Sequence, residues 1–177
     1  MEFMRHLYTT LIRPFLDYCS QLWGPPEGPS MDKLEKVQRN FLLLIPELRD
    51  KNYSEQLSLI RLQSLQRRFD RYRILYVRKA FHGLVPNMGM EIEHNMKHRL
   101  GMKVKIPRCK SKMKLESFSV RGPEIFNSLP KDIRNLDCGM DTFKIKLDEY
   151  LSMIPDTPRI DSGTLQVSNN LKEQIQN

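Results

Sequence analysis

Long hydrophobic runs are missing from this sequence. Although 40% of its 177 residues are hydrophobic, no apolar run approaches the roughly 20 residues that span a bilayer, so no membrane partner is expected. The N-terminus has no short apolar block followed by a small-residue cleavage site, so no secretory signal peptide is expected. Cysteines are few, far apart and odd in number: Cys19, Cys109 and Cys138. They predict free thiols and an intracellular protein, nuclear or cytoplasmic.

The motifs of common catalytic centres are missing as well. Polymerases and many nucleases hold two metal ions about 4 Å apart with converging carboxylates, yet the chain has no Asp-Asp pair. It also has no Cys-x-x-Cys, no phosphate-binding Gly-Lys-Ser loop and no dinucleotide fingerprint. His94 and His98 lie four residues apart, but no cysteine or paired acid near them completes a metal site. We expect no catalytic residue, no cofactor and no enzymatic activity of this chain on its own.

Positive charge, in contrast, is abundant. The net charge is +8, and residues 91–118 hold 8 Lys or Arg against 3 Asp or Glu. This short stretch therefore carries as large an excess of positive charge as the first 90 residues, whereas the rest of the chain is slightly negative. A local concentration of positive charge favours polyanions such as nucleic acid.

Helical periodicity dominates the first 83 residues. The spacing predicts helices over 2–22, with a kink at Pro14, over 30–45, from Ser54 for a short distance, and from Ser64 to Gly83. In the first helix, the expected buried stripe is Leu7, Leu11, Phe15, Tyr18 and Leu22. In the second helix, it is Leu34, Val37, Phe41, Leu44 and Ile45.

The long helix from Ser64 carries an arginine row. Arg67, Arg71 and Arg78 fall on the side opposite an apolar stripe. Two interpretations stay open here: a solvated helix face, or a face that contacts phosphates.

The period changes from helical to alternating after an irregular connector at residues 84–100. Lysines alternate with other residues over 102–106 and again over 110–115, with Pro107 to Cys109 at the expected turn. Alternation is the strand signature, so we predict a β-hairpin with one basic face. Its lysines are Lys103, Lys105, Lys110, Lys112 and Lys114.

Two more helices are predicted after the hairpin. In the first, over 118–129, Phe126 is the expected core anchor, and Arg121 either reaches a phosphate or pairs with an acid, with pairing favoured. The second is capped by Asp141 and buries Phe143, Leu147, Tyr150 and Leu151. After Pro155 the apolar pattern fades, which predicts a flexible tail.

The expected fold class is therefore mainly α: a helical, thumb-like bundle with a small basic β-hairpin and a disordered C-terminal tail. The expected organisation is a helical region over 1–83, a connector over 84–100, the hairpin and two helices over 101–154, and the tail over 155–177.

Five segments in order resemble a known family: "LYTTLIRPFLDYCSQLW", "MDKLEKVQRNFLLLIP", "LQSLQRRFDRYRILYVRKAFHGL", "FSVRGPEIFNSLP" and "FKIKLDEYL". Together they are similar to the C-terminal part of the reverse transcriptases (RNA-directed DNA polymerases) of jockey-type non-LTR, or LINE-like, retrotransposons. The resemblance covers residues 7–151. In that family, R-x-P-x-x-W-N-x-L-P follows a basic stretch. The matching residues are Arg121, Pro123, Asn127, Leu129 and Pro130, with Phe126 at the position where Trp is usual.

The resemblance implies a thumb and the region after it, separated from a catalytic half that lies upstream. Thumbs hold the template–primer duplex through phosphate contacts, which do not depend on base sequence. The implied partners are RNA, DNA or an RNA–DNA hybrid, together with the upstream polymerase half of a retroelement protein. The alternatives are a protein-interaction module, a relic fragment without a function, and one part of a longer enzyme.

Overall fold

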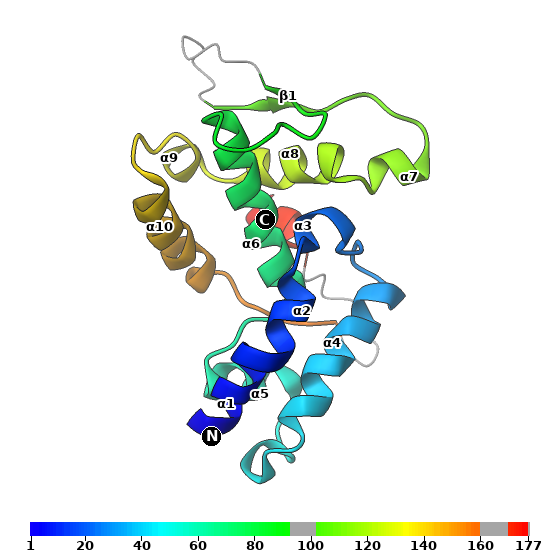
Figure 1. Cartoon of the computed structure of the whole chain (residues 1–177), viewed down its shortest axis with the longest axis vertical. Coiled ribbons are helices and arrows are strands. Elements are labelled where there is room, and N and C mark those ends of the chain that lie inside the picture. The colour runs from blue at the N-terminus through cyan, green and yellow to red at the C-terminus, as the bar shows by residue number, and fades with distance from the viewer. Residues whose placement is uncertain (93–101, 160–169, 177) are drawn as a thin grey trace. The chain divides into compact units, whose positions relative to one another are not determined.

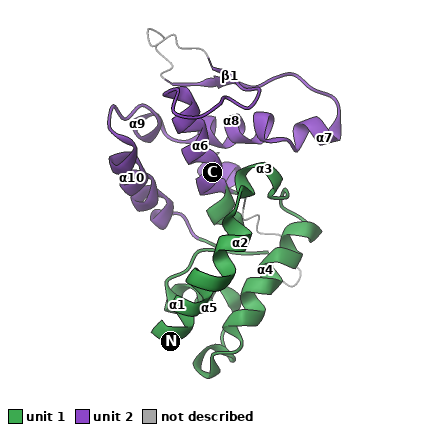
Figure 2. Cartoon of the chain, viewed as in Figure 1, with its two compact units in different colours: residues 1–69, 156–170 green, residues 70–155, 171–177 purple. Residues whose placement is uncertain are grey.

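A computed structural model describes residues 1–92, 102–159 and 170–176 of the chain (Figure 1). These residues are mainly helical, with a small two-stranded antiparallel sheet, as the sequence predicts. They form two compact units, Met1–Phe69 with Asp156–Asn170 and Asp70–Pro155 with Leu171–Asn177 (Figure 2). The division falls inside the long helix, whereas the sequence placed the first boundary at residue 83.

The first unit consists of short helices and the first turn of the long helix. Its elements are α1 (Glu2–Leu7), the π-helical turn η1 (Tyr8–Ile12), α2 (Arg13–Asp17), α3 (Ser20–Trp23), α4 (Pro29–Leu42), the 3-10 turn η2 (Pro46–Leu48), α5 (Tyr53–Ile60) and the start of α6 (Leu65–Phe81). Two small cores hold it together. One contains Leu42, Ile45, Leu48, Tyr53, Leu57 and Ile60. The other contains Met31, Leu65 and Phe69.

A kink is predicted at Pro14, and the structure has the π-helical turn η1 just before this residue. Pro14 has no N–H to continue the helical ladder, and the chain passes it with a wider turn in which Arg13 N–H donates to Tyr8 O. The predicted helix end at Leu22 is wrong. The helix ends at Asp17, because Cys19 takes a left-handed conformation with a φ of 51°, and the separate helix α3 follows.

The predicted buried stripe of the first helix is also wrong. Leu11, Phe15 and Tyr18 are exposed by 61%, 83% and 77%, while Tyr8 is fully buried. Two neighbouring rows of apolar residues run along this helix, each with a spacing of four. The row containing Tyr8 and Leu16 packs inward instead of the row containing Leu11 and Phe15.

The expected stripe of the second helix is buried only in part: Ile45 is buried, and Leu34 and Phe41 are half-buried beside the two small cores. Val37 and Leu44 are exposed, whereas the polar side chains of Glu35 and Gln38 are buried beside Leu42. Buried polar groups need hydrogen-bond partners, and here they are supplied by residues distant in sequence. Tyr53 Oη donates to Glu35, and Gln38 Nε2 donates to Gln63 O.

The second unit is built around α6, which is buried on most sides. Its other elements are β1 (Glu91–Ile92), β2 (Val104–Lys105), α7 (Lys112–Leu115), α8 (Phe118–Ser128), α9 (Lys131–Arg134), α10 (Met140–Met153) and α11 (Leu171–Gln176). Gly83 ends α6 with a φ of +68°, as predicted. Phe126 is fully buried, as predicted, and so are Phe143, Leu147 and Leu151 of the stripe predicted for α10, whereas Tyr150 is half-buried beside them. The expected cap residue Asp141 lies in the first turn of α10, and the N-cap is Gly139.

The two strands of the sheet are not the two that the sequence predicted. Strand β2 pairs with β1 from upstream, with Glu91 opposite Lys105 and Ile92 opposite Val104. The predicted second strand, over 110–115, contains helix α7 instead. Met113 and Leu115 in this stretch are exposed by 84% and 46%. Without a buried face or a partner strand, a helical turn satisfies the backbone hydrogen bonds locally.

The end of the chain differs in part from the predicted flexible tail. Asp156 accepts hydrogen bonds from Ser64 N–H and Ser64 Oγ, at 2.8 and 2.7 Å. Leu171 is fully buried in the core of the second unit, where α11 contacts α8. Residues 160–169 and 177 lie outside the described residues. Among the helices that are described, none combines the length and the apolarity that crossing a membrane requires.

Candidate nucleic-acid interface

The basic stretch that the sequence singled out lies at the surface of the second unit. We call residues 103–114 the basic segment; Figure 1 shows it leading from β2 through a light-green loop to α7. Its six cationic side chains are all exposed. They are Lys103, Lys105, Arg108, Lys110, Lys112 and Lys114. The structure thus brings the five predicted lysines into one short surface stretch, although not as a hairpin face.

Two asparagines hold the start of the basic segment. The side chain of Asn127 on α8 pairs with the backbone of Val104, accepting from its N–H at 3.0 Å and donating to its C=O at 2.7 Å. Asn135 accepts from the N–H of Met102 at 2.7 Å. Asn127 therefore supplies both hydrogen bonds that a neighbouring strand would give. This is a structural reason for an amide at this position of the motif.

Two buried arginines, Arg78 and Arg134, donate hydrogen bonds to backbone carbonyls next to this region. Arg78 Nη1 donates to Arg134 O at 3.1 Å, Arg78 Nη2 donates to Leu136 O, and the guanidinium lies 4.8 Å from the centre of the Phe143 ring. Arg134 Nη1 in turn donates to Asn127 O at 2.6 Å. Burial lowers the pKa of both arginines. These side chains position the segment after α8 and are not available to a phosphate.

The predicted arginine face of the long helix is not a solvent-facing surface. Arg67 and Arg78 are 1% and 0% exposed. Arg71 forms a two-pronged ion pair with Asp148, with Nε–Oδ1 and Nη2–Oδ2 distances of 2.5 and 2.7 Å. The sequence periodicity of α6 separates an apolar side from a basic side, but in the structure side chains on both sides of this helix are buried. The arginine row and the basic segment therefore do not form one cationic patch.

Arg121 on α8 is half-buried. Burial and, to a smaller extent, the charge of Arg73 lower its pKa to about 10, against the raising effect of Asp70, Glu116 and Glu124. Arg73 Nη1 is itself 2.6 Å from Asp70 Oδ1. Arg121 is therefore surrounded by charged groups of both signs, which favours a structural role for this side chain over a contact with a phosphate.

Few acidic side chains oppose the basic segment. Lys105 Nζ lies 2.6 Å from Glu91 Oε2, and Lys112 Nζ lies 3.9 Å from Glu116 Oε1. The other four cations have no acidic partner among the residues that the structure describes: Lys103, Arg108, Lys110 and Lys114, the last of which donates to Ser119 Oγ. The segment therefore presents uncompensated positive charge to solvent.

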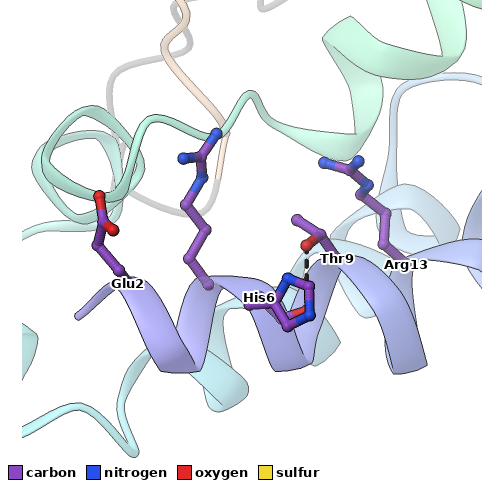
Figure 3. Close-up of a pocket in the computed structure, with 5 residues that line it drawn as sticks. Glu2, His6, Thr9 and Arg13 are labelled. Atoms are coloured by element: carbon purple, nitrogen blue, oxygen red, sulfur yellow. Dashed lines mark hydrogen bonds between the residues drawn. The ribbon is translucent and has the colours of Figure 1, made fainter.

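A second cationic feature lies in the first unit. Arg5 and Arg13 line a hollow along α1, η1 and α2 together with Glu2, His6 and Thr9 (Figure 3). Thr9 Oγ1 donates to His6 O, and Arg13 Nε lies 3.6 Å from Asp17. The hollow has a volume of about 290 Å³, at the lower edge of the roughly 300–1,000 Å³ of small-molecule sites. Arg5, Thr9 and Arg13 are spaced four residues apart, so in the sequence they form part of the polar side of the first helix.

Glu35 is a buried acid near the start of α6 whose pKa is shifted. Its carboxylate accepts from Tyr53 Oη at 2.6 Å and from Gln66 N–H at 2.9 Å. Burial raises its pKa to about 7, against the lowering effect of these hydrogen bonds. A carboxylate at a helix N-terminus compensates the first N–H groups and the helix dipole. We assign Glu35 a structural role, since it is 3% exposed.

Metal-binding clusters of three or more His, Cys, Asp or Glu residues are absent from the part of the chain that the structure describes. His94 and His98 lie outside that part. Comparison of the chain with protein-family models, with curated proteins and with solved structures gives no match. The family resemblance remains a prediction.

Proposed function

We propose that this chain is a non-catalytic nucleic-acid-binding fragment related to the thumb and post-thumb region of a non-LTR retrotransposon reverse transcriptase. In this proposal the basic segment binds the phosphate backbone of RNA, DNA or their hybrid. The observation that carries it is the exposure of six cations within residues 103–114, four of them without an acidic partner among the described residues.

The chemistry of the segment favours phosphates over bases. Lysine ammonium groups act as point charges and make backbone contacts without geometric selectivity. The anchoring of Val104 by Asn127 fixes one end of the segment, and Lys114 Nζ donates to Ser119 Oγ at the other, at 3.0 Å. Compared with the residues expected from sequence, the proposed surface gains Arg108 and loses Arg121 and the arginines of α6.

The salt dependence of binding tests this proposal. If about four cations touch phosphates, the slope of log affinity against log salt on duplex is near −3.6, or a roughly 100-fold loss between about 50 and 200 mM salt. Fluorescence anisotropy with labelled duplexes of unrelated sequence measures this slope. Replacing Lys103, Lys110 and Lys112 together with Gln should flatten the slope by about one unit per lost contact, equally for each sequence.

The matched control has the same net charge. Lys36, Lys51 and Lys131 are also exposed and lie outside the basic segment, so their replacement with Gln should leave most of the slope in place. Equal loss of affinity in the two triple variants would mean that binding follows net charge alone, and the basic segment would not be a site.

A further inference from the structure

Exposed apolar side chains are concentrated along one side of the first helix and in the turn and short helix α3 that follow it. We call Phe3, Leu7, Leu11, Phe15, Tyr18 and Leu22 the apolar row. Five of these side chains are exposed by 71% (Phe3), 61% (Leu11), 83% (Phe15), 77% (Tyr18) and 42% (Leu22). Trp23 beside the row is exposed by 44%. An exposed apolar patch of this kind marks an interaction site more often than a solvated surface.

The π-helical turn keeps this row straight. In a regular α-helix with 3.6 residues per turn, residues four apart drift around the axis by about 40° per step. The η1 turn, in which Arg13 N–H bonds to Tyr8 O, rotates less per residue and offsets the drift. Leu7, Leu11 and Phe15 therefore stay on one side of the helix, and Tyr18 and Leu22 follow after the helix ends at Asp17.

The chemistry of the row indicates a protein partner. None of its residues is charged, and the arginines of this helix, Arg5 and Arg13, belong to the separate hollow. A nucleic-acid surface requires cations, whereas aromatic residues with few charges are typical of the centre of protein interfaces.

The exposed area fits a partner of defined size. Each aromatic side chain has about 150–250 Å² to bury, so Phe3, Phe15, Tyr18 and Trp23 at their exposed fractions offer on the order of 500 Å². With the leucines, the row approaches the roughly 800 Å² that each partner contributes to an interface of standard size.

We propose that the apolar row binds the same row of a second copy of this chain, antiparallel, around a two-fold axis at Leu11. A two-fold interface must be self-complementary, and this register is. It sets Leu11 against the partner's Leu11 and Leu7 against the partner's Phe15, so that leucines meet at the centre and a phenylalanine ring flanks them on each side. The dimer is independent of nucleic-acid binding, which we assign to the other unit.

Sedimentation and light scattering over a concentration series test the dimer. Standard-size interfaces have micromolar or tighter affinity, so the wild-type chain should be dimeric at about 100 µM. The double variant Leu11→Glu, Phe15→Glu should be monomeric at this concentration, with an unchanged helical circular dichroism spectrum, because both side chains are exposed. The control Ile145→Glu, Met153→Glu adds the same charge at positions exposed by 59% and 77% and should remain dimeric.

A cross-link tests the register. Leu11→Cys places a thiol at the two-fold axis, so oxidation should give a disulfide-linked dimer well above the wild-type level, which reports the three native cysteines. Ile145→Cys should give no such increase.

A monomeric wild-type chain throughout the concentration series would overturn the proposal and leave the row to a different protein. A wild-type dimer that persists in the Leu11→Glu, Phe15→Glu variant would overturn it equally. The salt slope of nucleic-acid binding, measured at concentrations where the chain is monomeric, should be the same for this variant and wild type. A failure of the dimer proposal can therefore be distinguished from a failure of the nucleic-acid-binding proposal.

Discussion

Single residues carry much of the packing in each unit. Phe126 fills the centre of the second unit and is fully buried. Removal of a buried phenyl ring leaves a cavity, so Phe126→Ala should lower the free energy of unfolding by roughly 3–5 kcal/mol. Chemical denaturation measures this change. Met113→Ala, at a side chain 84% exposed, is the control and should stay within about 0.5 kcal/mol. A loss below about 1 kcal/mol for Phe126→Ala would contradict its role as core anchor.

The buried carboxyl of Glu35 makes stability depend on pH. Its pKa is raised from 4.5 to about 7 in the folded chain. Between these values the folded state holds the proton and the unfolded state does not, so stability falls as pH rises through this window. The loss is about 3 kcal/mol in total, because each pKa unit corresponds to about 1.4 kcal/mol.

The variant Glu35→Gln isolates this effect. Gln keeps an acceptor and cannot ionise, so the stability of the variant relative to wild type should rise by about 3 kcal/mol between pH 4.5 and 8. Glu47→Gln, at an exposed position, should follow wild type at every pH. Denaturant titrations over this range make the measurement, and parallel curves for Glu35→Gln and wild type would show that Glu35 ionises normally.

Among the secondary-structure elements, the last helix, α11, is expected to contribute to stability, although the sequence predicted a flexible tail there. Leu171 of α11 is fully buried and Lys172 Nζ lies 3.4 Å from Glu124 of α8. Leu171→Ala should therefore cost about 2–5 kcal/mol. Truncation after Met153 removes this packing and also the hydrogen bonds of Asp156 to Ser64. It should lower the melting temperature by more than Leu171→Ala does, as calorimetry can measure. A truncated chain that melts like wild type would return this region to the flexible tail that the sequence predicted.

For the whole molecule, the central expectation is binding without catalysis. The sequence has no Asp-Asp pair, and two-metal nucleotidyl transfer requires convergent carboxylates. Purified protein with primed template, nucleotides and Mg²⁺ or Mn²⁺ should give no primer extension above a control without protein. Extension that co-purifies with the chain and survives repeated purification would refute the non-catalytic assignment.

Hydrophobic periodicity by itself determined where most of the predicted helices lie. The long helix ending at Gly83, the helix of the Arg-Pro-Phe-Asn motif and the helix burying Phe143 were all predicted, because local propensity and a single apolar stripe agree there. Phe126 was likewise identified as a core residue. The basic stretch was found as an exposed surface, since charge is the one property of a side chain that sequence gives directly.

Only the tertiary structure decided which faces are buried and which strands pair. The first helix has two adjacent apolar rows, and the π-helical turn together with the neighbouring cores selects the one containing Tyr8. Arg78 is buried because carbonyl groups of Arg134 and Leu136, more than 50 residues away, accept its hydrogen bonds. Strand β2 pairs upstream with β1, and Asn127 completes its other edge. Contacts between residues this far apart in the chain leave no periodic trace in the sequence around either partner.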